Sequence, residues 1–352
     1  MSNLIGSAAS ASTVAAANPN LLHNGDMSIF QRGAGPFTSA TRFTNADDSY
    51  LLDGWIFLAN GADTCDVSQS TVSLPTGSRG AMRFDVETGN VKFGMVQVVE
   101  AADSLAMIGG VASLQFKYKL ANGVSIDRIR AAILAWSSTA DVVTSDVVSN
   151  WQAQGTLPTL AANWTLEGET GVLVPTSSWQ TAMLQNVAID TASAANVAVF
   201  LWADDTALTV GDFLDITDVK LEAGPYCTPY VRTPRAEEQS RCLTYLEVFG
   251  ADPLTTTTHF GSSGRSSSTT IALYNINCSP KLKQPTLMLS AVADFQVDDG
   301  ANVECSGLTL DQTHLSGGRL VATVAAGLTT GAVAFLRADT TAAARIWLTA
   351  EL

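Results

Sequence analysis

The chain has 352 residues, of which 46% are hydrophobic and only 15% are charged, and its formal net charge is −14. This length suffices for two domains of ordinary size, and the apolar content excludes a mostly disordered protein. Lys and Arg do not cluster along the sequence, so we expect no binding to nucleic acid or to an anionic membrane surface. No run of roughly 18 apolar residues predicts a membrane span.

Residues 1–20 are uncharged, rich in Ala and Ser, and show no core pattern. They predict a mobile arm, which could order on a partner surface or remain a loose terminus. No Lys or Arg precedes Arg32, so the charged start of a signal peptide is missing. A protein of this kind that acts outside a cell would be made in the cytoplasm and released by lysis.

Residues 21–232 predict a β-sandwich. Apolar and polar residues alternate over residues 114–120 and 127–136, which is typical of strands with one buried face. The continuous apolar run at residues 197–202 predicts a central buried strand. Many short strands separated by turns favour a sandwich or jelly roll. Two further strands are expected at residues 81–86 and 213–221, and residues 145–154 could be a short helix or a loop insertion.

Residues 233–249 predict a linking helix. Thr233 can be the N-cap, Pro234 fits the first helical position, and Glu237 and Glu238 lie near the positive end of the helix dipole.

Residues 250–352 predict a smaller, sandwich-like β-domain of about a hundred residues, with few large side chains. Its edge strands would need cover, because open edges pair with other chains, and oligomerisation would provide it. The expected strands are residues 267–277, 286–292, 307–311, 319–325, 332–337 and 344–351.

The reactive side chains form no catalytic pattern. The five cysteines are widely spaced and odd in number, which predicts free thiols and folding in a reducing cytoplasm. The three histidines are isolated. The carboxylate pairs Asp204-Asp205 and Asp298-Asp299 lie in turn-like stretches, whereas a glycosidase needs two carboxylates about 5–10 Å apart across a cleft. We therefore expect no enzyme activity.

Five short segments carry motif-like patterns: residues 20–33 (NLLHNGDMSIFQRG), 52–55 (LDGW), 219–245 (with VKLEAG, TPYVR and EEQSRCLTY), 280–286 (PKLKQPT) and 345–352 (RIWLTAEL). They resemble, in this order, motifs of a family of tail-fibre and head-fibre proteins of tailed bacteriophages. Phe30 replaces a tryptophan of the opening motif, residues 219–245 resemble the junction motif, and residues 345–352 resemble the ending. The resemblance spans residues 20–352 but depends on these separate segments.

The resemblance implies a jelly-roll domain like a carbohydrate-binding module, a small β-domain and usually a homotrimeric fibre or spike. It implies a virion location, contact between residues 1–20 and other virion proteins, and contact with a host-surface polysaccharide. It does not distinguish the phage head from the tail, nor identify the sugar.

A sugar site on a jelly roll needs exposed aromatic rings, which stack on the apolar face of a pyranose. The candidates are Trp136, Trp151, Trp164 and Trp179, each of which could instead anchor a loop. Trp55 and Trp202 lie in apolar runs and are expected in the core.

Jelly-roll modules of this type can hold a calcium ion where the first and last strands meet. The candidate ligands are Asn24, Asp26 and Asp218. Calcium needs about six to eight oxygen ligands, and only two of these residues are charged. The alternative is that residues 24–26 form only a tight turn. No other cofactor is expected.

We thus predict a mainly β protein: an arm (residues 1–20), a jelly roll (21–232), a linking helix (233–249) and a C-terminal β-domain for trimerisation (250–352). The predicted function is that of a non-enzymatic fibre or spike protein that contacts host glycan. The alternatives are a head-decoration or connector protein without a ligand and, third, a polysaccharide depolymerase.

Overall fold

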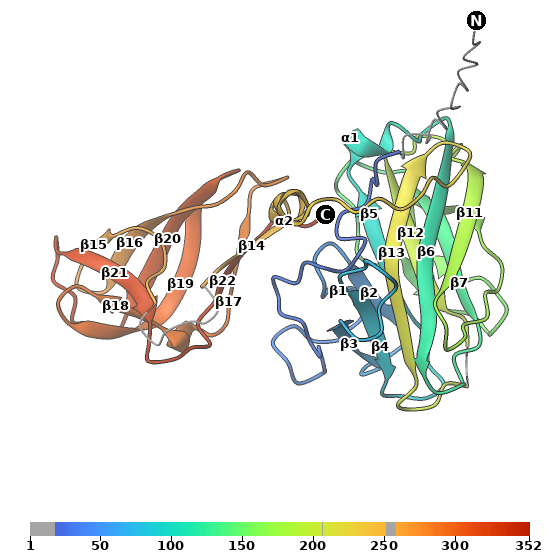
Figure 1. The fold of residues 1–352 in the computed structure, drawn as a ribbon. Coiled ribbons are helices and arrows are strands. Elements are labelled where there is room, and N and C mark those ends of the chain that lie inside the picture. The colour runs from blue at the N-terminus through green and yellow to red at the C-terminus, as the bar shows by residue number, and fades with distance from the viewer. Residues whose placement is uncertain (1–17, 206, 251–257) are drawn as a thin grey trace, which may run out of the picture.

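The computed structural model describes residues 18–205, 207–250 and 258–352. It has two β-rich halves joined near helix α2, Arg235–Leu243 (Figure 1). The prediction of a mainly β protein with a jelly-roll sandwich is confirmed. The predicted arm lies outside the described residues except for its last three, where Asn18 and Asn20 bond to Ala223 and Val219. Among the described residues the longest helix is α2 with nine residues, and no helix there could span a membrane.

The first half is a sandwich of two antiparallel sheets. The six-stranded sheet runs in the order β1 (Ser49–Tyr50), β2 (Ile56–Ala59), β5 (Phe93–Val99), β12 (Asn196–Ala203), β7 (Ile129–Trp136), β10 (Trp164–Glu169). The five-stranded sheet runs β11 (Gln180–Ala188), β6 (Val111–Asn122), β13 (Phe213–Ala223), β4 (Ala81–Val86), β3 (Cys65–Ser70). The short elements are α1 (Ala101–Ser104) and the pair β8 (Val148–Asn150) and β9 (Thr159–Leu160).

The alternation seen in the sequence places the core between these sheets. Leu114, Phe116 and Tyr118 of β6 point inward and are buried, while the residues between them face outward. Strand β12 is buried along its whole length, because loops cover the outer face of its sheet as well. All five cysteines are free, as predicted. Residues 145–154 hold β8 within a loop and form no helix.

The linking helix is shorter than predicted. It ends at Leu243, its N-cap is Pro234 rather than Thr233, and no side chain caps it. Leu246–Phe249 form β14 instead, and Phe249 pairs with Ile346 of β22 (Ile346–Thr349). The spacing of apolar residues over 242–249 is compatible with a helix or a strand. Residues 246–249 form a strand because they pair with the C-terminal strand β22.

The second half closes into a barrel, which the sequence pattern did not distinguish from a small sandwich. Its strands are β15 (Gly264–Ser266), β16 (Ile271–Asn277), β20 (Gly317–Val324), β19 (Asn302–His314), β18 (Phe295–Asp298) and β21 (Val333–Ala338). A sheet β14-β22-β17 lies beside it, with β17 at Thr286–Leu289 and a 3-10 turn at Val292–Asp294. Because closure removes edges, the described residues of this half leave open strand edges in the three-stranded sheet and not in the barrel.

A packed junction joins the halves. Trp347 of β22 belongs to the sandwich core, meets Phe43 edge-on at 5.1 Å and donates a hydrogen bond to the carbonyl of Gln31. Arg32 and Glu351 form a buried ion pair. The N–H of Ala350 also bonds to the Tyr245 carbonyl at 2.7 Å. Residues near positions 30, 245 and 350 therefore meet at this junction and hold the two halves together.

Candidate functional site

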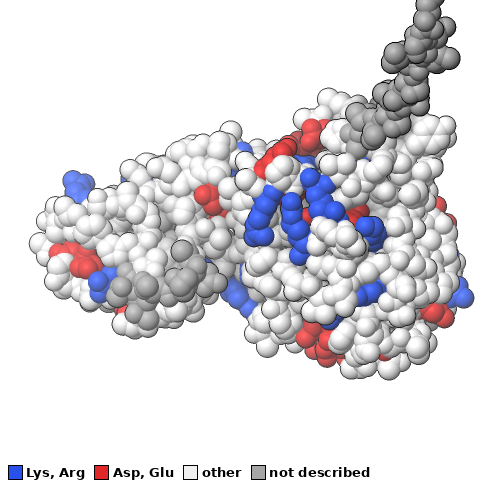
Figure 2. Space-filling model, in the orientation of Figure 1, with Lys and Arg blue, Asp and Glu red and all other residues white. Residues whose placement is uncertain are grey.

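The outer face of the five-stranded sheet carries charged side chains. Because alternate residues of β6 and β13 fill the core, the residues between them point outward, among them Lys117, Lys119, Asp215 and Lys220. Figure 2 shows Lys and Arg gathered on this side of the sandwich, between the places of α2 and β13 in Figure 1. These cations come from segments far apart in the sequence, so the sequence showed no basic cluster.

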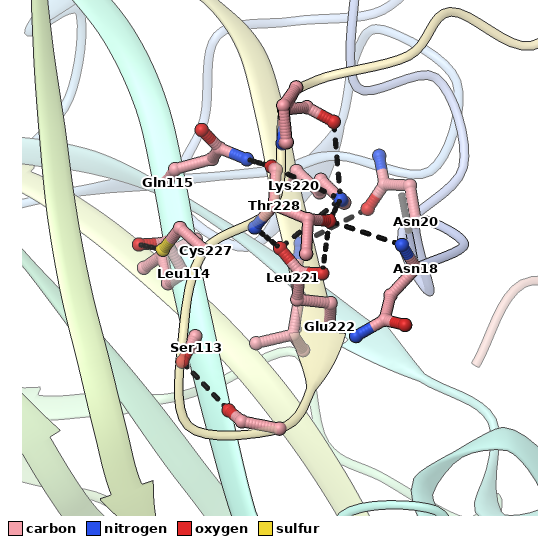
Figure 3. Close-up of polar contacts among 12 residues, drawn as sticks. Asn18, Asn20, Ser113, Leu114, Gln115, Lys220, Leu221, Glu222, Cys227 and Thr228 are labelled. Atoms are coloured by element: carbon pink, nitrogen blue, oxygen red, sulfur yellow. Dashed lines mark hydrogen bonds and ion pairs between the residues drawn. The ribbon is translucent and has the colours of Figure 1, made fainter. Parts of the chain in front are cut away.

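The end of this face near residue 223 is covered by the chain that leaves β13 (Figure 3). Thr228 donates hydrogen bonds from its backbone N–H and its hydroxyl to the Glu222 carboxylate, both at 2.6 Å. Lys220 lies 3.1 Å from Glu222 and bonds to the Thr228 hydroxyl at 2.5 Å. The side chains of Lys220 and Glu222 are both buried, and each neutralises the charge of the other. This part of the face is structural and closed.

The middle of the face holds the residues proposed for calcium. Asp218 accepts hydrogen bonds from Lys117 and Arg232, at 2.9 and 3.0 Å, and Asp26 lies 3.4 Å from Arg79.

The Asn24 side-chain amide donates hydrogen bonds to the carbonyls of Ile29 and Asp53, and its oxygen accepts the N–H of Ile29. The N–H of Met27 bonds back to the Asn24 carbonyl at 3.1 Å. Within the described ranges, no group of three or more His, Cys, Asp or Glu is placed to hold a metal ion. Lys117, Arg232 and Arg79 neutralise the carboxylates of Asp218 and Asp26, so these residues do not fit a calcium ion. Residues 24–27 form a turn.

The open part of the face centres on Trp179. Its ring is partly exposed, its Nε1 donates a hydrogen bond to the carbonyl of Ser73 at 2.6 Å, and the Lys119 ammonium lies 4.9 Å from the ring centroid. Beside it, Arg83 makes a bidentate ion pair with the buried Asp215 at 2.8 and 2.9 Å. Nearby, on β11, Met183 is 54% exposed. The Trp179 ring, whose N–H is already bonded, can stack on a sugar, and the partly exposed Arg83 guanidinium beside it can donate hydrogen bonds to the sugar hydroxyls.

The other three candidate tryptophans lie on the opposite side of the sandwich. Trp136, Trp151 and Trp164 are only 5–6% exposed and pack against the outer face of the six-stranded sheet. Trp136 meets Trp164 at 5.2 Å, and Trp151 meets Phe200 at 6.0 Å. In this conformation they form a second apolar layer that offers almost no surface to a sugar. Trp55 and Trp202 are buried as expected.

The carboxylate pair Asp204-Asp205 has structural partners. Asp204 pairs with Lys92 at 2.6 Å and with Arg130 at 3.0 Å. Asp205 accepts the backbone N–H groups of Asp127 and Arg128. Burial, reinforced by the Asp127 carboxyl, raises the pKa of Asp205 to about 7.

In the barrel, Asp298 pairs with Arg337 at 3.1 Å, and Asp299 accepts bonds from Ser266 and Thr329. Each of the two pairs fixes local backbone or strand ends.

No protein-family model and no curated protein sequence matches the chain. Solved structures resemble it at low scores. The module TmCBM61, in complex with β-1,4-galactotriose, is 14% identical with a TM-score of 0.31, covering 58% of this chain and 99% of that one. The CBM22-1 xylan-binding domain from Paenibacillus barcinonensis Xyn10C is 9% identical with a TM-score of 0.32, covering 60% and 97%.

The enzymatically active domain of tailspike protein 4 from bacteriophage CBA120 is 12% identical with a TM-score of 0.31. The match covers 56% of this chain but only 23% of the tailspike domain. At these scores the likeness adds nothing to the β-sandwich described above.

Proposed function

We propose that the chain binds a host-surface polysaccharide through the open part of the five-stranded sheet. The observation that supports this most is Trp179, which alone among the seven tryptophans, all within the described ranges, is not buried. It lies on a polar sheet face beside Lys119 and the Arg83–Asp215 pair. The ring offers the pyranose an apolar surface, and the partly exposed Arg83 guanidinium, held by Asp215, can donate hydrogen bonds to the sugar hydroxyls.

We further propose that the protein is a non-enzymatic fibre or spike component of a tailed-phage virion and forms a homotrimer. The motif resemblance of residues 20–33, 219–245 and 345–352 supports this proposal. Light scattering should give the mass of three chains, and mass spectrometry of purified particles should find its peptides. A single-chain mass at micromolar concentration contradicts the trimer.

The glycan proposal is tested by arraying host capsule and lipopolysaccharide fragments against the full chain. Calorimetry with the best ligand then compares wild type, Trp179→Ala and Phe335→Ala. Phe335 is a matched control, because it is a 38% exposed aromatic residue on the barrel. We expect Trp179→Ala to weaken binding about tenfold, the worth of one stacked ring, and Phe335→Ala to leave it unchanged. Equal binding by all three proteins contradicts the proposed surface.

Two alternatives have distinct outcomes. A head-decoration or connector protein without a ligand would bind no host glycan in the same array. A depolymerase would release reducing sugar from host capsule, and one Asp or Glu substitution would abolish the release. The partners of the Asp204-Asp205 and Asp298-Asp299 pairs favour the non-enzymatic proposal over the depolymerase.

A further inference from the structure

A groove runs between the sandwich and the second half of the molecule. Its volume is about 480 Å³, within the range of roughly 300–1,000 Å³ of small-molecule sites. Arg42 and Tyr50 line it from the sandwich, and Lys283 and Thr286 line it from the loop and strand of the second half. It lies apart from the Trp179 surface, with which it shares no lining residue.

The groove carries two cations, Arg42 and Lys283, that form no ion pair with any described residue. Most Lys and Arg side chains of the described part form ion pairs, but Arg42 and Lys283 form none there, and both are exposed. In a chain of net charge −14, two such cations beside one groove mark a local positive field. A small anion placed between them would be attracted from both sides.

The wall of the groove adds a third cation, the guanidinium of Arg32. Arg32 is buried, and its Nη2 pairs with Glu351, while its Nη1 is enclosed without a hydrogen-bond partner among the described residues. The Arg32 guanidinium carbon also lies 5.8 Å from the centre of the Tyr50 ring. The lining charges are therefore three cations against the one carboxylate of Glu351, with a hydroxyl at Thr286 and an aromatic surface at Tyr50.

We propose that this groove binds the carboxylate of an acidic saccharide unit, as a second ligand site. A guanidinium matches a carboxylate through two parallel hydrogen bonds, and an ammonium adds a point charge. The hydroxyl and aromatic lining suits the hydroxyls and the apolar face of a sugar ring. The choice of a saccharide as carrier of the carboxylate rests on the proposed function, whereas the anion site itself does not. Because Arg42 and Lys283 belong to different halves, the ligand would bridge them.

The test is calorimetry on the full chain at low salt and at about 0.15 M salt, since charge pairing weakens as screening grows. The probes are a galacturonic acid trimer, N-acetylneuraminic acid, the neutral galactose trimer and inorganic phosphate. The variants are Arg42→Ala/Lys283→Ala and, as a control with the same loss of charge, Arg235→Ala/Arg265→Ala. The control residues are exposed, form no ion pair in the described part and lie outside the groove.

We expect at least one acidic sugar to bind wild type and the control variant with equal affinity. Its affinity for Arg42→Ala/Lys283→Ala should be lower by about tenfold or more. Three outcomes overturn the inference: neither acidic sugar binds wild type at millimolar concentration, the groove variant binds as tightly as wild type, or the galactose trimer competes equally well. Phosphate that binds more tightly than both sugars overturns the choice of a saccharide.

Trp179→Ala separates this inference from the proposed function. Acidic-sugar binding that is lost in Trp179→Ala but kept in Arg42→Ala/Lys283→Ala contradicts the groove site and leaves the sheet surface standing. The reverse pattern contradicts the sheet surface and leaves the groove site standing.

Discussion

The two outer faces of the sandwich differ in what covers them. Outward residues of β12, such as Phe200 and Trp202, are apolar and lie beneath a layer of further tryptophans. Outward residues of β13, such as Lys220 and Glu222, are charged, and only one end of their face is covered. A tryptophan in a polar stretch is therefore a poor guide to a ligand surface by itself. The polarity of the strand face on which it lies separates a loop anchor from a candidate platform.

The largest effect is expected from the covered apolar face. Trp151→Ala removes a buried ring that packs on Phe200, and should lower the free energy of unfolding by about 3–5 kcal/mol. Trp151→Phe keeps most of the apolar contact and should cost clearly less. Denaturant unfolding measures both. A loss below about 1 kcal/mol for Trp151→Ala would show that this layer is loosely packed.

The covered end of the polar face should respond next. Thr228→Val removes a hydroxyl that bonds to both Lys220 and Glu222, leaving buried charges short of partners, at a cost of about 1–3 kcal/mol. Thr228→Ser retains the hydroxyl and serves as its control. If the two variants unfold at the same denaturant concentration as wild type, the contacts in Figure 3 do not hold this segment down.

The junction between the two halves contains a buried histidine, so its contribution to stability should depend on pH. His23 stacks on Tyr245 at 4.3 Å, and burial, with the nearby Arg241, lowers its pKa from 6.5 to about 3. Between about pH 6.5 and 3, His23 is therefore protonated in the unfolded chain but neutral in the folded chain. Stability should fall by about 1.4 kcal/mol per pH unit from pH 6.5 toward 3.

The variant His23→Phe isolates this contribution, because carboxylates titrate alike in both proteins. We expect the difference in unfolding free energy between wild type and His23→Phe to shift steadily from pH 7 to pH 5. A difference that stays constant over this range would contradict a neutral, buried His23.

The smallest effect on stability is expected at the open end of the polar face. Trp179→Ala loses one hydrogen bond and one cation–π contact at a partly exposed site, about 1 kcal/mol. Unfolding in denaturant measures it beside Trp151→Ala. A loss as large as that of Trp151→Ala would make Trp179 a structural residue like the other three candidates.

The sequence predicted β6 and β7 from their alternation and β12 from its continuous apolar run. It failed where one pattern suits two structures, because pairing of β14 with β22 made a strand of the residues after Tyr245. The sequence did not reveal the charged face, because Arg83, Lys119 and Asp215 come from three separate strands. A stronger signal was the alternation of β6 itself, which places Lys117 and Lys119 outward beside the apolar core residues.

If the proposed surface is correct, the bound glycan covers the ring of Trp179. Acrylamide quenching of tryptophan fluorescence tests it directly, because the other six tryptophans are buried. With a polysaccharide whose binding calorimetry has established, we predict that the quenchable fraction of wild-type fluorescence disappears. In Trp179→Phe that fraction should be missing from the outset. Quenching that stays the same with and without bound polysaccharide would contradict the claim and place the glycan elsewhere on the molecule.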